Sequence, residues 1–508
     1  MEQTKTKLPI SWESIKLGAF VENEKGKKPK RQSKDQTEEF TLPYVDIEAF
    51  EDGNIKSWTD GDGCRLCYES DFLMVWDGSR SGLVGKGIKG ALGSTLVRIN
   101  FPGMNNQYAY YFLLSKYQEI NTRAKGSGTP HVDPDLLWNY DFPIAPLNEQ
   151  KRIVAKIEEL FSELDNGIAA LKTAREQLKV YRQAILKHAF EGKLTAKWRE
   201  ENPDKLEPPE QLLARIQKER DARYQQQLEA WKVTIKEWEI KGKEGRKPDK
   251  PKQLSSPIVP SNDEIDNLPK VPSGFTYTYL ANIGDLGRGK SKHRPRNDTK
   301  LFGGKYPFIQ TGEVKAANRK IISFEQTYSD FGLEQSKLWP VGTLCITIAA
   351  NIAETAFLAF DGCFPDSVVG FSAYDSVLPE YVELFIKAVR IRIEAYAPAT
   401  AQKNINLTTL ENLVIPYCSL DEQKKIVDEL ESQFSVIDKN ETEIEQALKT
   451  AEALRQSILK KAFSGKLVLQ DQNDEPASNL LKRVKTEKAA QAIKISNKKR
   501  QTKDTCHD

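Results

Sequence analysis

Two long segments of the chain carry apolar side chains three and four positions apart, on a stripe with a 3.5-residue period. In residues 148–194 this stripe consists of Ile153, Ile157, Leu160, Leu164, Leu171, Ala174, Leu178, Tyr181 and Ile185. In residues 419–467 it consists of Ile426, Leu430, Ile437, Ile444, Ala447, Ala451, Leu454 and Ile458. A stripe this narrow, sustained over several heptads, is typical of a coiled-coil seam rather than of a helix on a globular core. Each segment is therefore predicted to be one long helix that pairs with the other.

The two segments are copies of one another. Residues 149–194 return without a gap as residues 422–467, where Glu149-Gln150-Lys151 is matched by Glu422-Gln423-Lys424 and both copies close with Ala-Phe-x-Gly-Lys-Leu. A repeat of this length is one structural unit used twice. Because the chain leaves the first helix to enter the domain that precedes the second, antiparallel pairing needs the shortest connection, and we expect it.

A domain precedes each helix. Residues 1–147, the first domain, and residues 272–418, the second domain, hold short apolar runs separated by turns rich in Gly, Pro, Asp and Asn. Such runs predict strands with few helices. The expected fold is α+β, with two pseudo-symmetric domains joined by two long antiparallel coiled-coil helices. We expect residues 195–271 to form a charged helical insert and linker, and the basic tail, residues 468–508, to be disordered.

Composition narrows the possible functions. The 508 residues carry a net charge of only +3, so a nucleic-acid surface would have to be local. No apolar run reaches the length of a membrane span, and the first residues lack the apolar core of a signal peptide, so we expect a cytoplasmic protein. Cys64 and Cys67 form a close pair, but without a second pair or nearby histidines this is a weak signal for zinc or redox chemistry, and no metal site is expected.

One loop of the second domain is dense in cations. Its candidate nucleic-acid residues are Arg288, Lys290, Ser291, Lys292, His293, Arg294 and Arg296. So many neighbouring cations repel one another unless phosphates neutralise them, and arginine can also read guanine edges. A solvated charged loop remains the alternative.

Further candidates are more scattered. The first domain lacks such a dense loop and offers a sparser set around glycines: Ser79, Arg80, Lys86, Lys89, Arg123, Lys125 and His131. The second domain adds Thr311, Lys403, Asn404 and Asn406. Two similar domains with different loops are expected to read two different targets in one manner.

Two other functions fit parts of the sequence. Residues 284–291 match the GxxxxGK[ST] pattern of a phosphate loop, but Pro295 disfavours the helix that must begin at the Lys-Ser pair. A purely structural coiled-coil adaptor would need no basic loops. The sequence contains no adenine-methylation motif of the Asn-Pro-Pro-Tyr type, no cofactor glycine fingerprint and no paired-carboxylate nuclease signature. We therefore expect a non-catalytic reader of nucleic acid.

The two helix beginnings, residues 146–154 and 419–427, together with the Ala-Phe-x-Gly-Lys-Leu endings, closely resemble the specificity subunit of type I restriction-modification systems. The resemblance implies that each domain is a target-recognition domain that reads one half of a bipartite, asymmetric site in double-stranded DNA. It also implies that two modification subunits and restriction subunits bind this chain and perform adenine methylation or cleavage. Those partners, and not this chain, would use S-adenosylmethionine, ATP and Mg.

Overall fold

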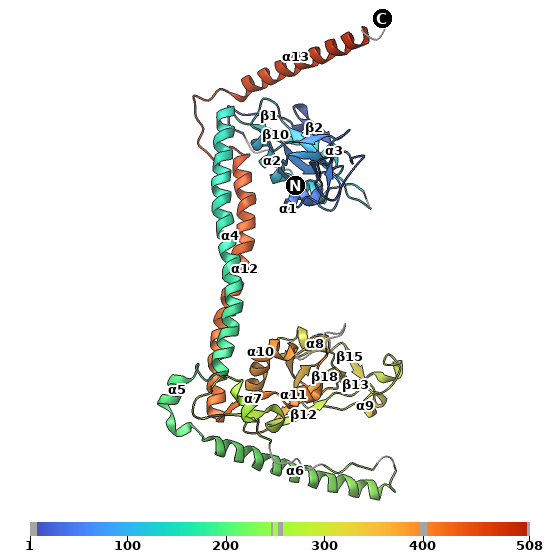
Figure 1. Ribbon diagram of the computed structural model, residues 1–508, viewed down its shortest axis with the longest axis vertical. Helices are drawn as coiled ribbons and strands as arrows, with labels where there is room; N and C mark the ends of the chain where they lie inside the picture. The colour runs from blue at the N-terminus through green and yellow to red at the C-terminus, as the bar shows by residue number, and fades with distance from the viewer. Residues whose placement is uncertain (1–7, 127, 245–246, 252–257, 396–403, 505–508) are drawn as a thin grey trace. The chain divides into compact units, whose positions relative to one another are not determined.

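The computed structural model describes residues 8–126, 128–244, 247–251, 258–395 and 404–504, with side chains up to residue 490 (Figure 1). The chain forms two compact units. Unit 1 contains residues 1–173 and 444–508, and unit 2 contains residues 174–443. Each unit therefore combines one domain with part of each long helix.

The first domain is built from three antiparallel or mixed sheets and short helices. The first sheet pairs β1 (Glu13–Lys16) with β10 (Asp141–Ile144). The second sheet has the strand order β2 (Glu22–Lys25), β9 (Leu96–Asn100), β6 (Phe72–Val75), β7 (Val84–Lys86). The third sheet has the strand order β4 (Trp58–Thr59), β3 (Leu42–Val45), β8 (Gly90–Leu92), β5 (Leu66–Cys67). Its helices are η1 (Leu17–Ala19), α1 (Ile47–Asp52), α2 (Asn106–Thr122) and α3 (Pro134–Trp138). The alternation of apolar residues in β6 and β9 directs Phe72, Met74, Val97 and Ile99 into one core with α2.

The second domain follows the same order of elements. β11 (Phe275–Tyr279) pairs with β19 (Val414–Cys418), and a five-stranded sheet has the order β12 (Gly284–Arg288), β18 (Val368–Ala373), β16 (Leu344–Thr347), β17 (Thr355–Leu358), β14 (Lys320–Ile321). A third sheet pairs β13 (Phe302–Phe308) with β15 (Gln326–Tyr328). The helices are α7 (Asn262–Asp266), η3 (Leu280–Asn282), η4 (Thr299–Leu301), α8 (Thr311–Ala316), α9 (Asp330–Glu334), α10 (Pro379–Ala395) and α11 (Leu407–Glu411).

The two domains share one topology. The strand order β2-β9-β6 of the first domain returns as β12-β18-β16 in the second, and β1-β10 returns as β11-β19. In both, a 17-residue helix, α2 or α10, follows the central sheet. The predicted α+β fold with two pseudo-symmetric domains is confirmed.

The long helices are α4 (Leu147–Phe190) and α12 (Leu420–Ala462), which pack side by side in both units (Figure 1). In unit 1 the start of α4 lies beside the end of α12, where Ile153 and Ile157 share a core with Ile458 and Leu459. In unit 2 the order is reversed, and Ile185 shares a core with Ile426 and Leu430. The pairing is therefore antiparallel, as predicted. The helices end earlier than expected, because Gly192 and Gly465 both adopt a left-handed φ of 69°, a common way to terminate a helix.

Burial follows most of the predicted seam, with two exceptions. The buried members are Ile153, Ile157, Ile185, Ile426, Leu430, Ile437, Ala451 and Ile458, and the half-buried ones are Leu160, Leu164, Leu171, Ala174, Leu178, Ile444 and Ala447. Leu454 and its counterpart Tyr181, by contrast, are 48% and 54% exposed. The seam passes instead from Ala451 through Arg455 to Ile458, in steps of four and three. Arg455 holds its seam position because its guanidinium lies 5.0 Å from the Phe161 ring and pairs with Asp165.

Unit 2 contains the same contact. Arg182, the counterpart of Arg455, lies 4.8 Å from the Phe434 ring and pairs with Asp438. A charged residue can occupy a seam when its stem packs on an aromatic ring while its head reaches an acidic partner. The repeat therefore preserves this arginine contact in both units.

The repeated Glu-Gln pair at the start of each helix is buried. Gln150 accepts from the Asn105 backbone N–H at 3.0 Å and donates to the Ala145 carbonyl at 2.8 Å. Gln423 accepts from Leu378 N–H and donates to the Cys418 carbonyl, both at 2.9 Å. The amide thereby joins the start of the long helix to the end of the last strand and to the start of the 17-residue helix, α2 or α10, which explains why the pair is repeated.

The insert and the tail also form helices. The insert contains α5 (Ala196–Glu201), η2 (Pro203–Lys205) and α6 (Pro209–Ile240), whereas the tail contains α13 (Ala477–Asp504). The prediction of a disordered tail is wrong for α13, because its first turns bury apolar side chains against the first domain: Ala477, Leu480, Leu481 and Val484. Composition alone suggested disorder, and tertiary packing overrides it.

The start of α13 repeats a short motif from the start of α6. Glu207-Pro208 is matched by Glu475-Pro476, and the motif Leu-Leu-x-Arg of residues 212–215 is matched by residues 480–483. Leu212 and Ile216 are buried in the core of unit 2, as Leu480 and Val484 are in unit 1. The repeated unit is therefore longer than the helix repeat indicated, and it extends through the first turns of α6 and α13.

Candidate nucleic-acid interface

The second basic loop, residues 288–296, follows β12 directly. Gly289 donates to the Val368 carbonyl at 2.9 Å and Lys290 N–H to the Phe364 carbonyl at 3.1 Å, so the loop starts against the β18 side of the sheet. The Gln335 side-chain oxygen then accepts from the backbone N–H groups of Lys292 and His293, at 2.5 and 3.0 Å. These bonds hold the loop in one conformation, which lowers the entropy cost of binding a ligand.

The cations of this loop differ in how far they are neutralised. Arg296 lies 3.1 Å from both carboxylate oxygens of Asp366, and Arg288 donates to the backbone carbonyl of Asp366. Arg294 donates to two backbone carbonyls of the loop, both at 2.8 Å. Lys290 and Lys292 are exposed and have no acidic partner among the residues that the structure describes. Unneutralised charge therefore remains for an anion.

The positive charge around the second basic loop affects the pKa values of two neighbouring residues, Lys337 and Asp298. Burial and the positive charge of Lys290 lower the pKa of Lys337, whose ammonium lies 3.5 Å from the centre of the Trp339 ring. The pKa of Asp298 is lowered by the backbone N–H of Lys300 and by His293, which lies 2.9 Å from its carboxylate. Ser291 is buried and accepts from the Tyr328 hydroxyl at 3.5 Å. Lys337 is a cation of this surface that the sequence analysis did not select.

The loop is not a phosphate loop of the nucleotide-binding type. β12 ends at Arg288, and the next helical turn is η4, which begins at Thr299. No helix starts at Lys290-Ser291, so the backbone dipole that such a site requires is missing from this place. The structure agrees with the expectation drawn from Pro295.

The other candidates of the second domain lie at two helix starts and one turn. Thr311 is the first residue of α8, and Asn406 caps α11 by accepting from Thr409 N–H at 2.8 Å. Asn404 forms a β-bridge with Ala349, beside Asn351, whose side chain accepts from Lys315 of α8 at 3.2 Å. The fold thus brings α8 and Asn404 to the same turn. Lys403 lies outside the described residues.

The first domain has a dense basic loop of its own, contrary to our expectation. The first basic loop, residues 25–34, contains six cations in ten positions, namely Lys25, Lys27, Lys28, Lys30, Arg31 and Lys34. It follows β2 just as the second basic loop follows β12. Gly26 donates to Leu96 O at 2.9 Å and Lys27 N–H to Leu92 O at 3.2 Å, the counterparts of the bonds that start the second loop.

Glycine is required at the start of both loops for one reason. A Cβ atom on Gly26 would lie 2.1 Å from the Gly93 carbonyl oxygen, and one on Gly289 would lie 2.2 Å from the Pro365 carbonyl oxygen. Only glycine permits such a close approach of two backbones. Gly26-Lys27 and Gly289-Lys290 are therefore equivalent positions, although the gapless repeat of the long helices does not align them. The density of cations in residues 25–34 was the sequence signal for this loop.

The cations of the first basic loop are only partly paired. Lys25 lies 2.6 Å from Asp77, and Lys30 lies 3.4 Å from Asp62. Arg31 pairs with Asp60 at 3.3 Å and with Glu39. For Lys27, Lys28 and Lys34 the described structure offers no carboxylate partner, and all three are exposed. These lysines resemble Lys290 and Lys292 in presenting free charge.

The sequence-predicted residues of the first domain surround this loop only in part. His131 forms β-bridges with Asp77, the partner of Lys25, and with Lys125, so these residues are brought together. Lys125 pairs with Asp133 at 2.9 Å, which raises the pKa of the lysine.

The rest of that set lies on neighbouring turns. Arg80 pairs with Glu51, and the carbonyl of Ser79 accepts from the Asn121 side chain at 3.0 Å. Arg123 lies 3.9 Å from Glu119. Lys86, at the end of β7, and Lys89 are exposed.

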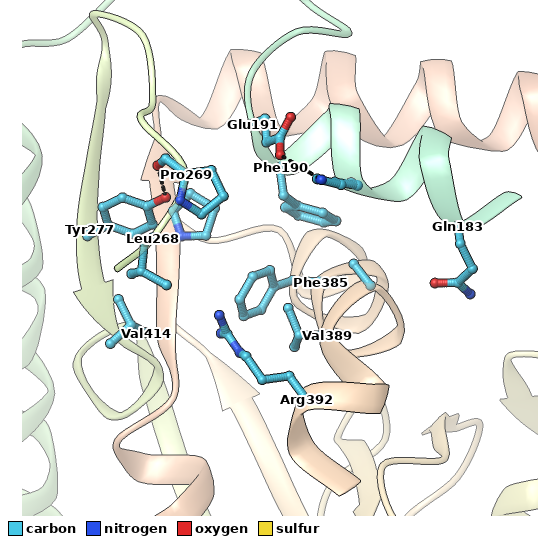
Figure 2. A pocket seen from close by; sticks show the side chains of 13 residues that line it. Gln183, Phe190, Glu191, Leu268, Pro269, Tyr277, Phe385, Val389, Arg392 and Val414 are labelled. Atoms are coloured by element: carbon cyan, nitrogen blue, oxygen red, sulfur yellow. Dashed lines mark hydrogen bonds and ion pairs between the residues drawn. The ribbon is translucent and has the colours of Figure 1, made fainter. Parts of the chain in front are cut away.

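Figure 2 shows a pocket in unit 2, between the end of α4, α10 and the β11–β19 pair. Its volume is about 280 Å³, and its lining is mainly apolar, with Phe190, Tyr277, Phe385 and Val389 around it and Arg392 reaching into it. This volume lies just below the range of about 300–1,000 Å³ that is usual for small-molecule sites. The lining of the pocket is mainly apolar, unlike the basic loops, so the pocket is not suited to binding phosphates.

The described structure gives no support for a reactive thiol, a metal site or a membrane-spanning helix. Burial raises the pKa of Cys67 to about 11, so this thiol is not activated. Within the part of the chain that the structure describes, no three His, Cys, Asp or Glu side chains gather in a way that could hold a metal ion. Nor does any helix of that part combine the length and the hydropathy of a membrane span.

Comparison with known proteins gives a consistent result. The model of the "Type I restriction modification DNA specificity domain" family matches residues 9–173 and 279–450. The EcoBI specificity subunit of Escherichia coli is 23% identical over 90% of this chain and 89% of its own length, and the EcoDI subunit is 24% identical over 97% and 99%. The MjaVIII specificity subunit of Methanocaldococcus jannaschii is 32% identical over 36% of this chain and 43% of its own.

Solved structures share the fold. A chain from a type I R-M system has a TM-score of 0.63 at 17% identity and covers 91% of this chain and 100% of itself. The HsdS subunit from Thermoanaerobacter tengcongensis has a TM-score of 0.50 at 16% identity, covering 92% and 100%. At this identity the likeness concerns the fold alone, which matches the architecture described above.

Proposed function

The chain belongs to the type I restriction-modification DNA specificity family and is a DNA target-recognition subunit, and from this premise we propose that its two domains read separate half-sites of a bipartite, asymmetric target. The observation that carries the proposal is the equivalent placement of the two basic loops. Each loop follows the equivalent strand of its domain, β2 or β12, and each starts with a glycine in close contact with a neighbouring backbone carbonyl, yet the loop sequences differ. A shared scaffold with different loops is what reading two different sequences requires.

The two loops would divide their work between the phosphates and the bases. Lysines without an acidic partner, such as Lys27, Lys28, Lys290 and Lys292, are suited to phosphates, because a flexible ammonium makes contacts that do not depend on sequence. Arg294 has a planar fork that can contact a guanine edge bidentately. Arg288 and Arg296 can contact DNA if phosphate groups replace Asp366 as their partner.

We further propose that the chemistry resides in partner subunits. Specificity subunits of type I systems assemble with other subunits of the system and bind DNA, and we assign two modification subunits and restriction subunits as the partners of this chain. They would use S-adenosylmethionine, ATP and Mg, whereas this chain would bind none of them. We expect no methyl transfer to DNA by this chain in the absence of partners.

The test exchanges one domain. Residues 1–145 are replaced by the corresponding domain of another specificity subunit, and the methylated motif is read from the genome of cells that carry the chimera and the modification subunit. We expect one half of the motif to change while the other half is retained. If both halves changed, or neither did, the division of reading between the two domains would be wrong.

A further inference from the structure

Helix α13 is attached to the first domain through its first turns. Ala477 donates its backbone N–H to the Ser11 carbonyl at 3.0 Å, and Val484 packs closely on Gly103, where an added Cβ would lie 2.6 Å from a Val484 methyl. Lys488 donates to the Ala19 carbonyl at 3.1 Å and lies 5.8 Å from the Phe20 ring. The Lys488 contacts lie at the end of η1 and at Phe20, two residues before β2, the strand that leads into the first basic loop.

Helix α6 is attached to the second domain in the same way. Leu212 and Ile216 occupy the positions of Leu480 and Val484. Arg220 occupies the position of Lys488 and donates to Asn282 of η3 at 2.7 Å. Arg215 pairs with Glu207 as Arg483 pairs with Glu475. The attachment therefore depends on the repeated motif and not on the net charge of the helix.

The two helices differ in charge although their attachment is the same. α13 contains nine Lys or Arg and two Asp or Glu, whereas α6 contains six of each. The charge of α13 is thus +7, in a chain whose total is +3. Like charges three and four positions apart, as at Lys482 and Lys485, destabilise a helix in isolation. The positive charge of α13 therefore does not stabilise the helix itself.

The distal part of α6 also has a packing role. Tyr224, Leu228, Trp231, Ile235 and Trp238 form a half-buried stripe, and the Trp231 indole donates to the Pro248 carbonyl at 3.1 Å. In α13 the residues after Lys488 include no aromatic residue and no acidic residue before Asp504. They carry instead Lys494, Lys498, Lys499, Arg500 and Lys503.

We infer that α13 is a basic arm that binds the DNA backbone beside the half-site read by the first domain. This inference rests on the proposed function, since it takes DNA as the ligand of the first domain. Phosphates are the partner that a run of lysines without aromatic residues fits best, because the contacts need charge and no shape. Residues 489–504 extend about 24 Å as a helix at 1.5 Å per residue. That length matches about seven base pairs at 3.4 Å each.

The experiment uses the full chain assembled with its modification subunit. The first variant replaces Lys494, Lys498, Lys499 and Arg500 with Gln, and the matched control replaces Lys232 and Lys236 of α6 with Gln. A third variant replaces the three lysines with Arg and retains the charge. Binding is measured over a salt series on two duplexes, one ending at the half-site of the first domain and one extended there by about ten base pairs, somewhat more than the length of the arm.

We expect the Gln variant to bind the extended duplex more weakly, with a plot of log affinity against log salt that is flatter by about 0.9 for each phosphate that the arm no longer neutralises. The short duplex, the α6 control and the Arg variant should behave as the wild type. Equal affinity and slope for the Gln variant on the extended duplex would overturn the inference, as would dissociation of the modification subunit without a change in DNA affinity. If the wild type itself failed to prefer its target over random duplex, the proposed function and not the arm would be at fault.

Discussion

Replacing Arg199 should destabilise unit 2, because it leaves the buried carboxylate of Glu422 without its cationic partner. The Glu422 side chain is 0% exposed, and its Oε1 accepts from Arg199 at 2.6 Å and from the Thr195 hydroxyl at 2.7 Å. Arg199 itself is only 11% exposed at its side chain. Breaking one side of a buried ion pair costs about 3–5 kcal/mol, because the remaining charge stays in a medium of low polarity. We expect Arg199→Met to destabilise unit 2 by this amount at neutral pH.

The repeat supplies a matched control. Glu149, the counterpart of Glu422, accepts from the Trp12 indole at 2.9 Å and from the neutral Gln470 side chain. Gln470→Met removes a hydrogen bond without removing a charge, and such a change costs about 1–3 kcal/mol. It should destabilise unit 1 by less than Arg199→Met destabilises unit 2.

The pH dependence provides a second signature. Burial raises the pKa of Glu422, whereas Thr195 and Arg199 oppose the rise. Without Arg199 the folded-state pKa rises further above the unfolded value, so the native state holds the proton more tightly than the unfolded state. The variant then regains stability as the pH falls through its folded-state pKa towards the ordinary value of Glu. The destabilisation by Arg199→Met should therefore be larger at pH 7 than near pH 5.

Hydrogen exchange of backbone amides can measure the two units separately in the full chain. Peptides from the start of α12 report unit 2, and peptides from α2 report unit 1. The double variant Arg199→Met with Glu422→Gln should recover much of the protection, since a neutral amide no longer needs the guanidinium. The reasoning is refuted if Arg199→Met costs no more than Gln470→Met, or if the double variant is as unstable as the single one.

Three further predictions concern DNA and the helix seam. Replacing Arg294 and Arg296 with Ala in the assembled methyltransferase should weaken DNA binding and flatten its salt dependence by about 0.9 per phosphate contact; unchanged affinity and slope in a filter-binding assay would contradict this. Replacing Lys27 and Lys28 with Gln should do the same through the first domain while the methylated motif stays the same, and an unaltered salt slope would exclude the first basic loop from the interface. Arg455→Met should change the free energy of unfolding by less than about 1 kcal/mol, because exposed ion pairs contribute little and Met can fill a seam position; a destabilisation above about 2 kcal/mol in a denaturant titration would show that the arginine contact is essential.

The sequence alone was sufficient for features that depend on local periodicity. The 3.5-residue stripe predicted both long helices, the gapless repeat predicted two copies of one unit, and the order of the domains along the chain predicted antiparallel pairing. The short apolar runs predicted the α+β domains, and the repeated motifs at the helix ends pointed to the family. These signals are visible in the sequence because each is a pattern of neighbouring residues, which does not depend on the contacts that the fold makes.

Only the tertiary structure decided the features that depend on contacts between distant residues. The equivalence of Gly26 and Gly289 became visible through sheet pairing, because the loops of the two domains differ in length and a gapless comparison passes over them. Arg455 displaced Leu454 from the seam because Phe161 and Asp165 lie on the partner helix. α13 is ordered at its start because the first domain offers an apolar surface for Leu480 and Val484, and the free energy of that burial is absent from any local pattern.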